Sequence, residues 1–365
     1  MSLVRLDITG IRNIQHASLV LDPKLNLVVG QNGSGKTSVL ESIYFLGSAR
    51  SFRNNSVEPL ISNSLDECLV RGEVESGGHL HTVGVQRNRG GSRVIRIDGD
   101  DVKRATNLAS LLPILLLGSG TVNLLLGPPG QRRRFLNWGL FHVEPSFSQV
   151  WEGANRCLKQ RNEVLRKNGS DDELETWTRE LVDYSERLDV SRHEYMRTYE
   201  AVFRENCKLL TELSNISCQY YRGWGDDSTL SDLYRKDRAI DRKRGFTQRG
   251  FQRADVRIRV NGEEAVNTCS RGELKVLSWA MLLSQGAMLE SGAAGDLLYL
   301  VDDMSAELDE QHRDRICRYL KSTGNQIVAT GIEQLSLVAS WKAQEQKLFH
   351  VEHGSLKHEE KLNGG

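Results

Sequence analysis

The sequence lacks a hydrophobic run long enough to cross a membrane. Its most apolar stretch, residues 111–117, contains Pro113 and falls well short of the roughly 18 apolar residues that a membrane-spanning helix needs. The first ten residues alternate apolar and polar side chains, without the basic start and apolar core of a secretory signal. We therefore expect a cytoplasmic protein that does not cross a membrane.

Paired cysteines and a net charge are also absent. The six cysteines are scattered, with no CxxC pair and no nearby histidine at metal-ligand spacing, so we expect them to be reduced and mostly buried. The 48 basic and 48 acidic residues cancel, which removes any global electrostatic attraction to nucleic acid. A surface that binds DNA must therefore be local.

What remains is an ordinary globular composition over 365 residues, with 39% hydrophobic and 26% charged side chains. Short β-like runs separated by glycine-rich turns fill the first hundred residues, and β-like and helical runs alternate again after residue 256. Between them, residues 145–213 are polar with apolar residues at helical spacing. This order predicts one α/β lobe built from both chain ends, with a helical lobe inserted.

The pattern of the helical stretch predicts a short coiled-coil-like arm. Ordinary bundle packing fits the same pattern, because the pattern spans too few heptads to distinguish the two. One helix is expected on each side of the polar turn 167–172. The residues expected in the seam are Leu174, Trp177, Leu181, Tyr184 and Leu188 on one helix, and Trp151, Ala154, Leu158 and Leu165 on the other.

The strongest motif is a complete GxxxxGK[ST] phosphate-binding loop. It consists of Gly30, Gln31, Asn32, Gly33, Ser34, Gly35, Lys36 and Thr37. An apolar run, 25–29, precedes it and a helix-like segment, 38–46, follows, so backbone N–H groups and a helix N-terminus can converge on phosphates. We expect Lys36 to reach the β and γ phosphates of ATP, and Thr37 to bind Mg²⁺.

A second part of the site is expected at the end of the apolar run 297–301. Asp302 follows this run directly and supplies the carboxylate that Mg²⁺ requires near the hydroxyl of Thr37. Asp303 comes next and is the candidate for orienting or deprotonating the attacking water. Two aspartates after an apolar strand are common by chance, and their pairing with the phosphate loop makes them informative.

Two further segments are typical of ABC-type ATPases. Ser270 and Gly272 open an apolar helix-like run and offer a hydroxyl and N–H groups to an anion. Alone, this segment would be an ordinary helix cap, but it precedes the acidic strand by about 30 residues, as a signature loop does. Residues 305–309 resemble the D-loop that crosses the same interface. We expect ATP to clamp two copies of the chain together.

These motifs predict an α/β fold with an ABC-type P-loop ATPase head. The head should comprise residues 1–105 and 256–365, and the inserted lobe with its arm residues 106–255.

Over nearly its whole length the sequence resembles the RecF family. The segments that carry the resemblance, beyond the ATPase motifs, are 11–14, 127–136, 247–256 and 349–354. The resemblance implies that Arg12 and Asn13 belong to the nucleotide site, and that an ATP-dependent homodimer binds single-stranded or gapped DNA, or single-strand/double-strand junctions. It also implies action with RecR and RecO in recombinational gap repair, replication restart and the SOS response, helping to load the recombinase.

Three departures from the family pattern bear on hydrolysis. Residues 117–121 replace a proline-glutamate pair, residues 250–255 replace a glycine-proline-histidine-arginine run, and Glu273 stands where glutamine is usual. They affect the expected rate of ATP turnover more than ATP binding. We therefore expect a weak, DNA-stimulated ATPase at most.

A local excess of positive charge is the candidate DNA surface, with a solvated or internally paired surface as the alternative. Ten basic residues face three acidic ones between positions 235 and 259. The basic residues are Arg235, Lys236, Arg238, Arg242, Lys243, Arg244, Arg249, Arg253, Arg257 and Arg259. Residues 132–134, three consecutive arginines, are expected to extend it, and contacts to the DNA backbone rather than to bases are expected.

Other functions were weighed against this one. An ABC ATPase that serves another partner, such as a transporter, does not need the arm and the basic strip. A chromosome-organising ATPase would have coiled coils of hundreds of residues, whereas this arm has about seventy. A nucleotide-regulated scaffold would keep Lys36 and Asp302 without useful hydrolysis.

Overall fold

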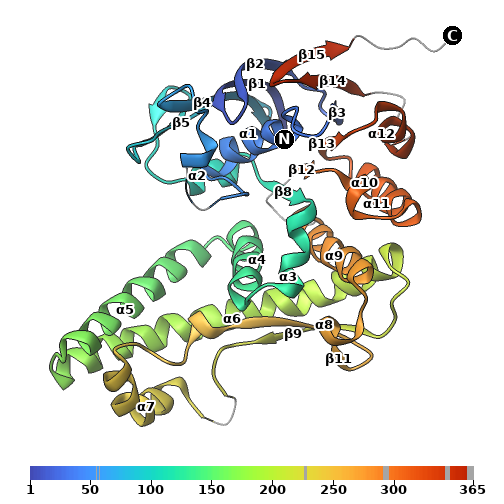
Figure 1. Ribbon diagram of the computed structural model, residues 1–365. Helices are drawn as coiled ribbons and strands as arrows, with labels where there is room; N and C mark the ends of the chain where they lie inside the picture. Colours follow the sequence, from blue (N-terminus) through green and yellow to red (C-terminus); the bar gives the residue numbers. More distant parts are fainter. Residues whose placement is uncertain (55, 57, 226–227, 291–295, 342–345, 360–365) are drawn as a thin grey trace. The chain divides into compact units, whose positions relative to one another are not determined.

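Parallel strands form the sheet that carries the predicted phosphate loop (Figure 1). The computed structural model describes residues 1–54, 56, 58–225, 228–290, 296–341 and 346–359. In this sheet the order is β15-β14-β3-β13-β12-β8, and β15 pairs antiparallel at one edge. The strands are β3 (Leu25–Val29), β8 (Ile114–Leu117), β12 (Leu298–Val301), β13 (Gln326–Gly331), β14 (Lys347–Glu352) and β15 (Ser355–Glu359). The central strands β3, β12 and β13 are buried throughout, which explains their nearly continuous apolar sequences.

An antiparallel sheet in the order β2-β1-β4-β5-β6-β7 belongs to the same unit. Its strands are β1 (Ser2–Ile11), β2 (Ile14–Val20), β4 (Glu67–Ser76), β5 (His79–Asn88), β6 (Arg93–Ile97) and β7 (Asp100–Asp101). Helix α1 (Lys36–Ser48) contacts both sheets, and its buried residues, including Ile43 and Phe45, join one hydrophobic core with both. Helix α1 is buried on most sides, and its buried residues include the polar Ser38, Glu41 and Ser42 as well as apolar side chains.

Short helices complete this first unit. They are α2 (Thr106–Leu111), α10 (Met304–Glu307), α11 (Glu310–Ser322) and α12 (Gln334–Trp341), with 3₁₀ turns at Glu58–Leu60 and Ser119–Val122. The side chain of Asp309 caps α11 by accepting a hydrogen bond from the N–H of His312, a standard N-cap interaction.

The second unit is mainly helical. A hairpin of α5 (Phe147–Lys167) and α6 (Asp171–Leu210) forms its arm (Figure 1). The chain turns at Asn168, with φ 50°, and Ser170 caps α6. Most of the predicted seam is buried or half-buried. Trp151 is the exception: its side chain is 38% exposed, because it lies on the outer face of α5, one position away from the buried Val150.

The rest of the second unit packs around α6. It comprises α3 (Asn123–Leu126), α4 (Pro129–Val143), α7 (Leu230–Arg244), α8 (Ala265–Thr268), α9 (Arg271–Glu290), a 3₁₀ turn (Phe251–Arg253), and the sheet of β9 (Ile216–Tyr221), β10 (Asp255–Val260) and β11 (Glu263–Glu264). Helix α9 is fixed to α6 by buried polar contacts as well as by packing: the hydroxyl of Tyr199 donates to the carbonyl of Met281, and the amide of Asn206 donates to Ser284.

The unit boundaries differ from those expected from the sequence. The first unit comprises Met1–Thr121 and Ala293–Gly365, and the second Val122–Gly292. Residues 106–121 belong with the head because β8 pairs with β12. Residues 256–292 belong with the helical unit because β10 pairs with β9 and α9 packs on α6. The sequence boundary at residue 256 was therefore wrong by more than one helix.

The α/β fold itself is as predicted. Among the helices that the structure describes, none is both long and apolar enough to span a membrane.

Candidate nucleotide-binding site

The loop between β3 and α1 has the backbone of a phosphate-binding loop. Gly33 and Gly35 have φ values of +78° and +124°, a region that side chains rarely adopt, so these two positions need glycine. The loop tip, 31–33, is exposed, whereas Ser34 and Lys36 are buried. Because Lys36 is the first residue of α1, the free N–H groups of the helix start lie beside its side chain.

The ammonium group of Lys36 is held by the loop itself. Its Nζ donates to the carbonyl oxygens of Gly30 at 2.8 Å and Gln31 at 3.0 Å. Burial lowers the pKa of Lys36 below its ordinary value, and the nearby carboxylates of Asp303 and Asp302 oppose that shift. Phosphate oxygens would also favour the charged form, and they are the usual partners of this lysine in such loops.

Thr37 and Asp302 form the predicted pair. Thr37 Oγ1 lies 3.2 and 3.3 Å from the two carboxylate oxygens of Asp302. Thr330, at the end of β13, donates its hydroxyl to Asp302 Oδ1 at 2.8 Å and accepts the N–H of Asp303 at 2.9 Å. Thr330 is not among the site residues predicted from the sequence. Its signal was a polar residue at the carboxyl end of an apolar run, the same signal that identified Asp302.

The two aspartates differ in their surroundings. Burial is the largest effect on Asp302 and raises its pKa, as does the charge of Asp303, while the hydroxyls of Thr330 and Thr37 lower it. A nearby divalent cation would favour the ionised form. Asp303 has a left-handed backbone, with φ 44°, and accepts a hydrogen bond from the hydroxyl of Ser305. Its carboxylate is therefore oriented by the D-loop-like segment.

Arg12 and Asn13 both contact elements of the loop, in different ways. The guanidinium of Arg12 makes two hydrogen bonds, of 2.8 and 2.9 Å, to the fully buried Glu41 of α1. The amide of Asn13 donates to the carbonyl of Ser34 at 2.9 Å and accepts from the hydroxyl of Ser38. In the described structure both residues hold the loop and its helix in place, and a direct contact of either with nucleotide remains a prediction.

The chemistry of this site suits a nucleoside triphosphate with Mg²⁺. Ser34 Oγ is buried and has no hydrogen-bond partner in the described part of the chain, which leaves a donor for a phosphate oxygen. The lysine, the helix N-terminus and the Thr37–Asp302 pair supply the cation, the N–H groups and the hard oxygen ligands that such a ligand requires.

Ser270 and Gly272 lie at the start of α9, in the second unit. The N–H of Glu273 donates to Ser270 Oγ at 3.3 Å and the N–H of Ser270 donates to Glu273 at 2.7 Å, which is a capping box. The N–H of Ser270, and then its hydroxyl, lower the pKa of the Glu273 carboxyl. Ser270 and Gly272 are exposed, so they are accessible to a ligand or to a second molecule.

Comparison with known proteins fits this geometry. A model of the RecF/RecN/SMC N-terminal domain matches residues 2–355. DNA replication and repair protein RecF of Pseudomonas paraeruginosa is 40% identical over 359 residues, covering 98% of this chain and 97% of the relative. RecF of Stutzerimonas stutzeri is 40% identical with the same coverage. The chain belongs to the RecF family of DNA replication and repair proteins.

Solved structures share the fold. One, described as the recombination mediator protein RecF with ATP in the RecFOR pathway, has a TM-score of 0.86 at 22% identity and 98% coverage of both chains. A second, of RecF with ATPrS, has a TM-score of 0.85 at 22% identity, over 98% of this chain and 97% of the other. A more distant likeness, to an Smc head bound to a ScpA domain, has a TM-score of 0.58 at 13% identity, over 100% and 98% of the chains.

One departure from the RecF pattern lies beside the carboxylate of Asp302. Gly118 follows β8, and a Cβ added there would lie 3.1 Å from the Cβ of Asp302. Its N–H is satisfied by the hydroxyl of Thr121 at 3.0 Å. Gly118 therefore brings no side chain to this edge of the site.

The basic strip is partly neutralised within the chain. Four of its ten basic residues form ion pairs: Arg235 with Asp232, Arg238 with Glu175, Arg242 with Asp171, and Arg249 with Asp237. In the same way, Arg132 binds Asp255 and Arg133 donates to the carbonyl of Ala254.

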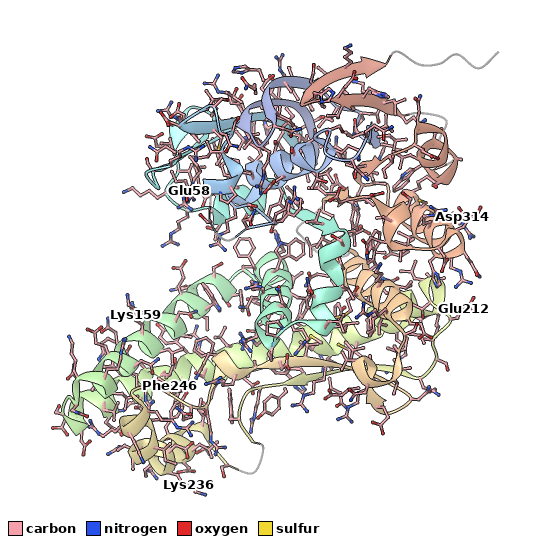
Figure 2. All side chains as sticks on the ribbon, in the orientation of Figure 1. Glu58, Lys159, Glu212, Lys236, Phe246 and Asp314 are labelled. Carbon is pink, nitrogen blue, oxygen red and sulfur yellow. The ribbon has the colours of Figure 1, made fainter. Side chains whose placement is uncertain are left out.

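The remaining basic side chains define a smaller surface. Of the other six, Lys236, Lys243 and Arg244 on α7, Arg253 in the 3₁₀ turn and Arg257 on β10 are exposed, and Arg259 on β10 is half-buried. None of these six forms an ion pair with a carboxylate in the described residues. Figure 2 labels Lys236 on α7 and Phe246 just after it. Arg132 and Arg133 thus have structural contacts, whereas Arg134 is exposed. The candidate DNA surface is reduced to the exposed basic residues of α7 and β10, with Arg253 and Arg134.

Proposed function

We propose that this RecF-family protein binds ATP and Mg²⁺ at the β3–α1 loop and uses them to dimerise on DNA. The observation that supports it best is the meeting of Lys36, Thr37 and Asp302 at the start of α1, with Thr37 Oγ1 3.2 Å from Asp302. Thr37 and Asp302 are 265 positions apart in the chain, and packing of the fold does not require a lysine, a hydroxyl and a carboxylate to lie together. A magnesium nucleotide site does require these three groups together.

Each residue has a proposed role. Lys36 and the N–H groups at the start of α1 bind the phosphates, and Thr37 and Asp302 hold Mg²⁺, which neutralises charge on the phosphates. Asp303, oriented by Ser305, positions and deprotonates the attacking water. Ser270 and Gly272 of a second copy approach the γ-phosphate, and the dimer forms for that reason. Turnover is slow because Gly118 offers no side chain near Asp302.

The proposed biological role is recombinational gap repair, replication restart and SOS induction in the cytoplasm. The dimer would bind gapped or single-stranded DNA or junctions, act with RecR and RecO, and help to load the recombinase. The similarity to RecF proteins of DNA replication and repair supports this role, as does the likeness to structures of a recombination mediator in the RecFOR pathway.

Binding of a fluorescent gapped duplex tests this proposal. We expect ATP with Mg²⁺ to tighten binding at two salt concentrations, and Lys36→Ala to abolish the ATP effect while weak salt-sensitive binding persists. If the wild-type protein binds ATP and its affinity for DNA does not change, the nucleotide does not control DNA binding and the proposal fails.

The signature loop requires a control for its capping role. Ser170→Ala is matched to Ser270→Ala because Ser170 caps α6 in the same way, accepting from the N–H of Glu173 at 3.2 Å. Loss of either cap costs about 1 kcal/mol, but only Ser270→Ala should prevent dimerisation with ATP. Ser270→Asp keeps a capping oxygen and repels phosphate, so it too should remain a monomer.

A nucleotide-regulated scaffold is the second candidate, and the bare Gly118 beside Asp302 favours it. Under this alternative, hydrolysis is irrelevant. Asp303→Asn separates the two functions, with Ser305→Ala as a milder companion. If Asp303→Asn binds ATP and dimerises normally and the complex persists much longer than the wild type, hydrolysis releases DNA. If lifetimes are equal, the scaffold function is correct.

A further inference from the structure

The carbonyl oxygen of Ser34 accepts two hydrogen bonds from distant parts of the chain. Asn13 Nδ2, from the β1–β2 turn, donates to it at 2.9 Å, and the N–H of Gly354, from the β14–β15 turn, donates at 2.8 Å. A carbonyl has two lone pairs, so both are used. The peptide group after Ser34 is thus held from outside the loop by two turns, and Asn13 Nδ2 also lies 3.3 Å from the carbonyl oxygen of Gly33.

This peptide group also carries the N–H of Gly35. In a planar trans peptide the carbonyl and the N–H point in opposite directions. Holding the Ser34 carbonyl toward the two turns therefore points the Gly35 N–H away from them. Gly35 is the residue just before α1, and N–H groups at this place in a phosphate loop bind the phosphates.

The β14–β15 turn is packed too tightly against the loop to move independently of it. Gly354 has φ +79°, and a Cβ there would lie 2.1 Å from the carbonyl oxygen of Asn13. On β14, just before this turn, the carbonyl oxygen of Val351 lies 2.3 Å from the position that a Cβ on Gly30 would take. Both glycines are required by close approach of backbones, not by the turn alone.

We propose that the β14–β15 turn is a positioning part of the nucleotide site, in which Gly354, together with Asn13, sets the direction of the Gly35 N–H toward phosphate. This inference rests on the proposed function, since it assumes that ATP binds at this loop. It assigns a role to the segment 349–354, which carries the family resemblance and is about 320 residues from the loop in sequence.

Two substitutions disturb the hydrogen bonds to Ser34, one at each turn. Asn13→Asp keeps an acceptor for the hydroxyl of Ser38 and replaces the donor to Ser34 with an oxygen. Gly354→Ala places a methyl group against Asn13. Gly99→Ala is the matched control for the backbone strain, because Gly99 has φ +91° and follows Asp98 with φ 54°, as Gly354 follows His353 with φ 47°. A Cβ on Gly99 would contact nothing within 4 Å.

The measurement is the dissociation constant of fluorescent ATP and ADP with Mg²⁺, alongside the thermal midpoint of each variant. Losing one hydrogen bond to a charged group weakens binding by roughly tenfold to a hundredfold. We expect this loss for Asn13→Asp and Gly354→Ala with ATP and ADP alike, and less than additive loss when they are combined, because both act on one carbonyl. Gly99→Ala should lower only the thermal midpoint.

The outcomes separate the inference from the proposed function. If the wild type fails to bind ATP, the proposed function fails. If the wild type binds, and Asn13→Asp and Gly354→Ala bind equally well below their thermal midpoints, the turn merely supports the sheet and the inference is wrong.

Discussion

The hydroxyl of Thr37 lies within hydrogen-bond distance of both carboxylate oxygens of Asp302, at 3.2 and 3.3 Å. Thr37 is the second residue of α1 and Asp302 directly follows β12. The parallel pairing of β3, β13 and β12 brings these two positions to the same edge of the sheet. Ligands of open α/β sheets bind at the carboxyl ends of the strands. The fold therefore brings together the proposed Mg²⁺ ligands from two segments that are far apart in sequence.

Asp302→Asn should weaken ATP binding in the presence of Mg²⁺ by tenfold or more, a rough figure for loss of a charged metal ligand. It should have little effect without the metal. Titration of fluorescent ATP with and without Mg²⁺ measures this, and Asp100→Asn, at an exposed aspartate on β7, is the control. Equal losses with and without Mg²⁺ would mean that Asp302 does not bind the metal.

The arm depends on a buried ion pair. Arg161 Nη1 and Asp241 Oδ2 are 2.9 Å apart, and both side chains are 1% exposed. Asp241→Asn or Arg161→Met should each lower the free energy of unfolding by about 3–5 kcal/mol, because each leaves a buried charge without its partner. Chemical denaturation measures this.

An exposed ion pair on α7, the helix that carries Asp241, is the control for the buried pair. Arg235→Ala, which breaks the Arg235–Asp232 pair, should change the free energy of unfolding by less than about 1 kcal/mol. A similar loss for Arg235→Ala and Asp241→Asn would contradict the structural role of the buried pair.

Stability should fall in mild acid because of His142. Its ring lies near Trp138, with ring centroids 4.3 Å apart, and burial lowers its pKa to about 4 from 6.5. Between these values the unfolded chain binds the proton and the folded chain does not. The free energy of unfolding therefore decreases as pH falls through this window, by about 1–2 kcal/mol for a ring that is partly exposed.

Replacing the ring tests the origin of this acid sensitivity. His142→Phe cannot bind a proton, so its free energy of unfolding should vary less between pH 6.5 and 4 than that of the wild type. Urea denaturation at several pH values compares the two. Parallel curves would assign the acid sensitivity to other groups.

DNA affinity should depend on the unpaired basic residues of α7. Lys236→Gln and Lys243→Gln should each weaken binding to all DNA sequences alike and reduce the slope of log affinity against log salt by about 0.7–0.9. Lys167→Gln is the control, because Lys167 is exposed and pairs with Glu163 at 2.8 Å. An unchanged salt slope in both α7 variants would remove α7 from the DNA surface.

The positions of the predicted site residues rest on local signals. The phosphate loop follows an apolar run that proved to be β3 over residues 25–29, and Asp302 follows another. Their side chains meet in the structure because β3, β13 and β12 are parallel and align their carboxyl ends; the motif pair predicted this meeting, and periodicity did not.

Long-range pairing was not predictable. The contacts of Gly354 with Ser34 and of Arg12 with Glu41 depend on tertiary packing, for which the sequence has no local signal. The same limit misplaced the unit boundary, since residues 114–117 pair with a strand near the other chain end. The sequence also does not show which distant acidic residue pairs with a given basic residue, as Glu175 pairs with Arg238.

The central claim is that ATP joins two copies of the chain on DNA. Sedimentation velocity of the wild-type protein with a gapped duplex, in the presence of ATP and Mg²⁺, tests it most directly. Our account predicts a complex with two protein copies per duplex, which reverts to one or none without ATP or with Lys36→Ala. A complex with a single copy and bound ATP would contradict the account.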